Sequence, residues 1–322
     1  MPVPNVDRRI GETATSLIER LKGLRDADRA VLELVALGAP AVLPLRRLLF
    51  EREPSGIYEP RCNAVSALAS LRAEDTLLEF LEQASLKGIY DPVERTGQDA
   101  VINAAARALR NRRDDGCFGT LMRLAAERPL AGVIEALGDM GRDEAIPRLV
   151  EGLSSDLTRS VAGVALSKFG PKSRPLLMSL VLNPRPSEEC ETATSMRTRW
   201  SALGVLGTIG LTLEEWSLLR PLMDARDARV AALAARLALT TQQPLVDRGE
   251  AVGRLIRLLK SADWLLTMQI EGWLAEANDL TLRIINRAVD RGDETVRDEV
   301  VRNSLLRVIA SGAAKSLAAV RR

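Results

Sequence analysis

Apolar and polar positions along this chain repeat with the period of an α-helix. In DARDARVAALAARLAL (224–239), four apolar residues spaced i, i+3, i+4 and i+7 form one helical face: Val230, Leu233, Ala234 and Leu237. Asp227 precedes this face, and its carboxylate can accept a hydrogen bond from a free amide of the first turn. The segment therefore predicts an amphipathic helix capped by Asp227.

Similar helices recur along the sequence. Most copies have a polar start and an alanine-rich apolar face: DADRAVLELVALG (26–38), EPRCNAVSALASL (59–71), QDAVINAAARALR (98–110), RPLAGVIEALGDMG (128–141), DLTRSVAGVALSKFG (156–170) and RTRWSALGVLGTIG (197–210). A second kind of helix lies between them, as in APAVLPLRRLL (39–49) and DEAIPRLVEGL (143–153). The copies recur about every 30 to 40 residues, an interval typical of a helical solenoid.

Because the two kinds of helix alternate, we expect helical hairpins, each an outer helix followed by an inner helix. They are predicted at 12–22/27–37, 40–51/60–71, 75–84/99–110, 116–126/129–139, 142–153/156–169, 171–182/195–209, 212–223/227–239, 249–260/263–276 and 279–290/294–310. Each hairpin buries its apolar face only against its neighbours, so one domain is expected over 1–322. Within it we expect an N-terminal cap at about 1–25, repeats at about 26–310 and a short capping helix at about 311–322.

The pairing of EAIPRLVEGL with a helix of the pattern DxxRxxAxxALxxxG resembles HEAT repeats, in the subgroup also found in phycobilisome lyase subunits. The resemblance extends over roughly residues 11–310. It implies an all-α fold, an α-solenoid with a right-handed superhelix of about eight to nine HEAT-like hairpins. A bilin lyase subunit is a less favoured functional alternative, since the chain shows no distinctive chromophore-handling motif.

The composition narrows the chemistry. The chain has no histidine, which removes Ser-His-Asp and Cys-His catalysis and nearly all imidazole metal sites. An iron-dependent hydroxylase also uses HEAT-like repeats, but it holds its metal with histidines, so the resemblance does not extend to that activity. We expect no cofactor, no metal site and no enzymatic activity.

The same sequence indicates a cytoplasmic protein. Its three cysteines, Cys62, Cys117 and Cys190, contain no CxxC pair, and this spacing fits a reducing compartment better than a disulfide framework. The first residues lack the pattern of a signal peptide, and no apolar stretch is long enough to span a membrane.

Two similar loops interrupt the regular pattern. GIYEP (56–60) and GIYDP (88–92) contain the only two tyrosines of the chain, Tyr58 and Tyr90, each before an inner helix. Tyrosine combines an apolar ring with a polar tip, which suits a contact surface. We expect the tyrosines to anchor a partner protein, with Glu59, Asp91 and Arg95 as the polar rim. The alternative is that each ring covers the top of its own inner helix.

Two further segments are expected to be loops. VERTGQD (93–99) extends the second tyrosine loop before its helix begins. NPRPSEECETATSM (183–196) is proline-rich and acidic, and the glutamates around Cys190 disfavour its thiolate, so we do not expect a nucleophile there.

A nucleic-acid site is the main alternative. HEAT-like alkylpurine DNA glycosylases use aromatic and acidic residues on a basic face, and here Arg197 and Arg199 flank Trp200. However, the formal net charge is only +2, and no carboxylate lies one turn from Trp200 on its helix. Arginines on the outer helices could form a basic stripe, but we expect them to lie over neighbouring helices and pair with local carboxylates. The sequence therefore favours a non-catalytic protein-binding scaffold or regulatory adaptor.

Overall fold

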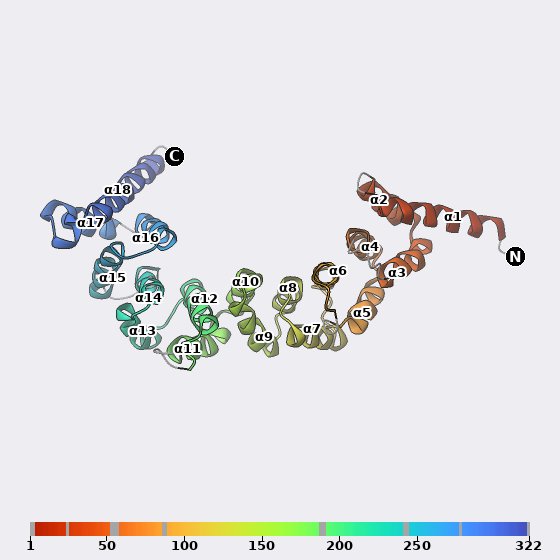
Figure 1. Ribbon diagram of the computed structural model, residues 1–322, viewed down its shortest axis with the longest axis horizontal. Helices are drawn as coiled ribbons and strands as arrows, with labels where there is room; N and C mark the ends of the chain where they lie inside the picture. The colour runs from red at the N-terminus through yellow and green to blue at the C-terminus, as the bar shows by residue number, and fades with distance from the viewer. Residues whose placement is uncertain are drawn as a thin grey trace. The chain divides into compact units, whose positions relative to one another are not determined.

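The computed structural model describes residues 4–23, 26–51, 58–85, 89–186, 191–240, 245–276 and 279–320, and within these ranges it describes no side chains at 4–12, 245, 279–280 and 312–320. All regular secondary structure in these ranges is helical, as Figure 1 shows. The all-α prediction is therefore confirmed. Within the same ranges, no helix is both long and apolar enough to cross a membrane.

The helices follow one another as hairpins with short connections. The first five hairpins are α1 (Pro4–Leu21) with α2 (Ala27–Leu37); η1 (Ala39–Ala41) and α3 (Val42–Phe50) with α4 (Glu59–Ser70); α5 (Glu74–Gln83) with α6 (Pro92–Ala108); α7 (Asp115–Glu127) with α8 (Ala131–Met140); and η2 (Asp143–Ala145), α9 (Ile146–Glu151) and η3 (Gly152–Ser154) with α10 (Arg159–Phe169).

Four more hairpins follow along the chain. They are η4 (Gly170–Ser173) and α11 (Arg174–Leu182) with α12 (Ala193–Ile209); α13 (Leu213–Leu219) and η5 (Arg220–Asp224) with α14 (Ala228–Thr240); α15 (Leu245–Leu258) with α16 (Trp264–Glu276); and α17 (Asp279–Arg291) and η6 (Glu294–Arg297) with α18 (Glu299–Val320). Each predicted hairpin is present, most with ends displaced by only a few residues.

The hairpins stack in chain order within two compact units, residues 1–169 and 170–322. In the first unit the inner helices α2, α4, α6, α8 and α10 contact one another in sequence, and the outer helices α1, α3, α5, α7 and α9 do the same. In the second unit α12, α14, α16 and α18 form the same kind of inner layer, and α15 contacts α17 in the outer layer. This is the architecture of an α-solenoid. The single domain and the right-handed superhelix remain predictions.

Side-chain caps fix where several inner helices begin. Asp227 accepts a hydrogen bond from the amide of Val230 at 2.8 Å, as predicted for the start of α14. Asp91 accepts bonds from the amides of Val93 and Glu94 at 2.9 and 2.8 Å, and Pro92 occupies the first turn. The residues predicted as a loop at 93–99 are therefore the first two turns of α6. The cap explains the difference, because it starts the helix before the first long apolar run.

The end of the chain differs from the prediction in a similar way. Helix α18 continues without interruption from Glu299 to Val320, so the residues expected to form a separate capping helix extend the last inner helix. The sequence there contains no proline, and a single Gly312 costs a helix only about 1 kcal/mol, so nothing in the sequence forces a break.

Small residues allow the inner helices to approach closely. Helix α8 lies between α6 and α10, and a glycine faces each neighbour. A methyl group on Gly132 would overlap the backbone of Asn103 in α6, with the Asn103 Cα only 2.7 Å away. The amide of Gly132 also donates to the Asn103 side-chain oxygen at 2.5 Å. On the other side, a methyl group on Gly138 would overlap the Cβ of Ala165 in α10.

Arginines on the outer helices bridge successive hairpins. Arg46 of α3 binds Glu79 of α5, and Arg174 of α11 binds Glu215 of α13 at 2.7 Å. Arg220 of η5 binds Asp247 and Glu250 of α15 at 3.0 and 2.5 Å. The prediction that outer-helix arginines pair with local carboxylates is confirmed for these residues, so they do not form an unpaired basic stripe.

We expect Gly132→Ala to lower the free energy of unfolding by about 2 kcal/mol or more, because α8 must move away from α6 to admit the new methyl group. Thermal and urea unfolding measure this change.

Gly119→Ala is the matched control. Gly119 lies on the exposed face of α7, and a methyl group added there would have no atom within 4 Å, so alanine should stabilise the helix by about 0.5–1 kcal/mol. Equal effects of the two substitutions would contradict close packing of α6 and α8.

Candidate functional site

The two tyrosines lie at the starts of adjacent inner helices but in different environments. Tyr58 precedes α4, and its ring packs on Gly97 of α6, where a glycine Cβ would come within 3.2 Å of the ring. Its side chain is only 36% exposed. Tyr58 therefore covers the next inner helix, which neither of the two expected roles described. Gly56, Ile57 and Gly88 of the two loops lie outside the described residues.

Tyr90 has the opposite environment. Its side chain is 91% exposed, between Ile89, which is buried, and Asp91, which caps α6. The backbone on both sides of Tyr90 is therefore held by the fold while the ring faces solvent. Val93, the second residue of α6, is 62% exposed and adds a second apolar side chain to this segment. The sequence pattern did not single out Val93, because it was assigned to a loop.

The three polar residues of the predicted rim differ in their contacts. The Asp91 carboxylate is occupied by the first amides of α6, so its main role is structural. Arg95 is exposed on the first turns of α6. Glu59 lines a cavity of about 490 Å³ together with Lys22 and Asp28, residues of the preceding hairpin. Of the exposed residues that follow Tyr90, Val93 supplies an apolar side chain and Arg95 a charge that no described residue pairs with.

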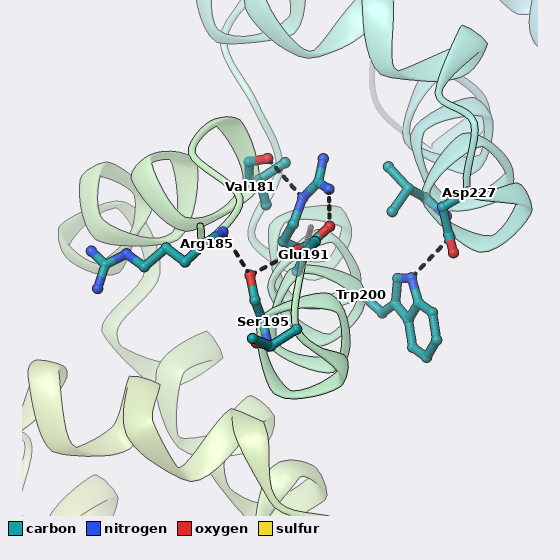
Figure 2. A network of polar contacts seen from close by, with 9 residues as sticks. Val181, Arg185, Glu191, Ser195, Trp200 and Asp227 are labelled. Carbon is teal, nitrogen blue, oxygen red and sulfur yellow. Dashed lines mark hydrogen bonds and ion pairs between the residues drawn. The ribbon is translucent and has the colours of Figure 1, made fainter. Parts of the chain in front are cut away.

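Two of the three predicted nucleic-acid residues, Arg199 and Trp200, make polar contacts in the second unit, and Figure 2 shows this region. Arg199 is 3% exposed. Its Nε donates to the carbonyl of Val181 at 3.1 Å, and its Nη1 forms an ion pair with Glu191 at 2.7 Å. Glu191 also accepts a hydrogen bond from the hydroxyl of Ser195 at 2.7 Å. Arg199 is thus bound inside the fold and is not available to a phosphate.

A second arginine repeats this arrangement in the first unit. Arg61, near the start of α4, is 8% exposed and donates from Nε to the carbonyl of Leu49 at 2.9 Å. Leu49 and Val181 are each the penultimate residue of the preceding outer helix. The motifs RCNAV (61–65) and RWSAL (199–203) align at both arginines. This alignment is the sequence signal that identifies Arg199 as a structural residue of the repeat.

Trp200 is also engaged between hairpins. Its indole N–H donates to Asp227 at 3.0 Å, as Figure 2 shows, and the guanidinium of Arg229 lies 4.9 Å from the ring centroid. Asp227 is therefore an acidic residue beside Trp200, but its oxygen already accepts bonds from the indole and from the amide of Val230. The side chain of Arg197 is half-buried and forms no hydrogen bond or ion pair with the residues that the structure describes. This geometry does not favour a phosphate-binding surface.

The described cysteines are poor nucleophiles. Burial, together with the nearby Asp114 carboxylate, raises the pKa of the Cys117 thiol to about 11. Burial also raises the pKa of Cys62. Both thiols are therefore protonated at neutral pH. Cys190, with Glu188 and Glu189, lies outside the described residues.

A family model agrees with the helical repeat. A family model described as PBS lyase HEAT-like repeat matches residues 130–155, which include α8 and α9. Together with the stacked hairpins, this match confirms the predicted resemblance to HEAT repeats, and it does so for one repeat, at residues 130–155. No curated protein sequence matches the chain. Among solved structures, human deoxyhypusine hydroxylase in complex with glycerol is similar at 15% identity and a TM-score of 0.27, covering 85% of this chain and 96% of that chain.

Because the environments of the tyrosines differ, their removal should affect stability differently. We expect Tyr58→Ala to lower the free energy of unfolding by about 1–2 kcal/mol, since the ring loses its contact with α6. We expect Tyr90→Ala to change it by less than about 0.5 kcal/mol. Urea unfolding followed by circular dichroism tests both, and a large loss in Tyr90→Ala would show that its ring is not free.

Arg199→Ala should destabilise the protein by about 3–5 kcal/mol, because it leaves the Glu191 carboxylate buried without its partner. Arg197→Ala is the control two residues earlier on the same helix, and it should cost less than about 1 kcal/mol. Thermal unfolding measures both. Similar small effects would show that Arg199 does not depend on the Glu191 pair and that it is free to bind a ligand.

Proposed function

We propose that this protein is a non-catalytic adaptor that binds another protein through the surface around Tyr90. The exposure of Tyr90 carries this proposal. An aromatic side chain that is 91% exposed at a fixed position is costly to leave in water and gains most when a partner covers it. We define the Tyr90 surface as Tyr90, Val93 and Arg95.

The local structure supports this role because it holds the backbone of Tyr90 before a partner arrives. Ile89 is buried in the first unit, and the Asp91 cap with Pro92 fixes the first turn of α6. Ordering a loop and its side chains on binding costs free energy, so a prearranged anchor binds more tightly than a free one. Tyrosine has few rotatable bonds, which keeps the remaining cost small.

The composition of the Tyr90 surface also suits a protein partner. Two exposed apolar side chains, Tyr90 and Val93, provide contact area, and the exposed Arg95 can pair with a carboxylate of the partner. The sequence contains no histidine, and the thiols of Cys62 and Cys117 are protonated. Both facts support a binding role over acyl-transfer or thiol catalysis. We further propose that the protein acts in the cytoplasm, where such thiols stay reduced.

Site-specific crosslinking tests the proposal directly. We expect p-benzoylphenylalanine in place of Tyr90 to give a discrete crosslinked adduct in a lysate of the cells that make the protein. Tyr90→Ala should weaken capture of the same partner by about 30-fold, the effect of losing about 2 kcal/mol at a central anchor.

Leu218 provides the control. It is 57% exposed on α13 and belongs to the second unit, whereas Tyr90 belongs to the first, so the crosslinking residue there should give no such adduct and Leu218→Ala should leave capture unchanged. Full capture by a stably folded Tyr90→Ala protein would refute the proposal.

A further inference from the structure

A pocket between two outer helices of the second unit contains arginines that lack the partners found elsewhere. Its volume is about 330 Å³, and it lies between α15, α17 and η6. Three arginines line it: Arg257 from α15, and Arg287 and Arg291 from α17. None of their side chains forms a hydrogen bond or an ion pair with any residue in the part of the chain that the structure describes.

This cluster differs from three other arginines of the outer layer. Arg46, Arg174 and Arg220 each bind a carboxylate of the next outer helix, which neutralises their charge. At the α15–α17 contact no such carboxylate is supplied by the described residues. The residues of α17 that face the pocket are Ile284, Arg287, Ala288 and Arg291, at the spacing of one helical face. Like charges gathered this way repel one another unless an anion joins them.

The remaining lining indicates what kind of anion fits. Asp293 is the only carboxylate among the described residues that line the pocket, so three arginines and one aspartate leave a formal charge of +2. A phosphate monoester carries about two negative charges at neutral pH, whereas a carboxylate carries one. The planar guanidinium group also matches the geometry of phosphate oxygens. Charge balance therefore favours a phosphate dianion.

The pocket also has an apolar side. Ile256 and Val296 are buried at its wall, and Ile284 and Ala288 lie beside the arginines. Gly253 on α15 leaves space there, since a methyl group at that position would meet only the Arg257 Nη1, at 3.8 Å. The volume is at the lower end of small-molecule sites. We propose that this pocket binds a small organic phosphate, with the phosphate on Arg257, Arg287 and Arg291 and the carbon body on Ile256, Ile284 and Val296.

The proposal does not depend on the Tyr90 surface, which lies in the other unit. Isothermal titration of the full chain at constant ionic strength tests it with inorganic phosphate, phenyl phosphate and benzoate as probes. We expect saturable binding at one site, with phenyl phosphate tighter than inorganic phosphate and benzoate weakest. Absence of saturable binding by both phosphates would overturn the proposal.

Two variants test whether the phosphate binds in the pocket or is held only by the general positive charge of α17. Arg287→Gln should weaken phenyl phosphate binding about tenfold or more, since it removes one charged hydrogen-bond donor. Arg283→Gln is the matched control, because Arg283 is exposed on the same helix but does not line the pocket. Equal weakening by the two variants would mean that the anion is held only by the general charge of α17, which would refute the site.

Gly253→Leu fills the pocket without changing its charge. We expect it to abolish phenyl phosphate binding while the melting temperature of the ligand-free protein is kept, since leucine favours a helix more than glycine does. Retained phenyl phosphate binding in this variant would place the ligand elsewhere. Competition by a single-stranded DNA oligonucleotide at equal phosphate concentration would also count against a small-molecule site, because it would indicate a nucleic-acid surface.

Discussion

Inner helices in this protein approach one another so closely that their contacts admit little more than hydrogen atoms or methyl groups. Two contacts hold α8 between its two neighbours: Gly132 lies against the backbone of Asn103, and Gly138 lies against Ala165. The same requirement explains the alanine-rich stripe of α14, in which Val230, Ala231, Ala234 and Ala238 are buried. Each hairpin covers its apolar side only with the next hairpin, so stability accumulates from one interface to the next.

Polar side chains also link the helices, both within a hairpin and between successive hairpins. Arg61 and Arg199 each link an inner helix to a carbonyl near the C-terminal end of the outer helix before it. Arg46, Arg174 and Arg220 tie one outer helix to the next. These five arginines thus hold helices together, whereas the three arginines of the α15–α17 pocket have no such partner among the described residues.

The sequence was sufficient to predict the repeat because its evidence is periodic. Apolar spacing, aspartate caps and alanine stripes recur in most copies. A segment whose own pattern is ambiguous can therefore be assigned by comparison with the other copies. The boundary errors have local causes: Asp91 caps α6 before its first apolar run, and nothing in the sequence stops α18 near Gly312.

The candidate site was less predictable, because exposure depends on contacts between repeats. The motifs around Tyr58 and Tyr90 are nearly identical in sequence, yet only the first ring has a glycine of the next helix, Gly97, to pack against. In the same way, the sequence could not show that Arg199 meets Glu191 inside the fold, or that Trp200 meets Asp227 across a hairpin boundary.

The placement of the tryptophans has a spectroscopic consequence. All four lie in the second unit, where Trp200 binds Asp227 of the following hairpin and Trp216 binds Asp247 of α15 at 2.8 Å. Intrinsic fluorescence of the chain therefore reports almost entirely on residues 170–322, whereas far-ultraviolet circular dichroism reports on both units. Coincidence or separation of these two signals during denaturation distinguishes a chain that unfolds in one cooperative step from one that unfolds unit by unit.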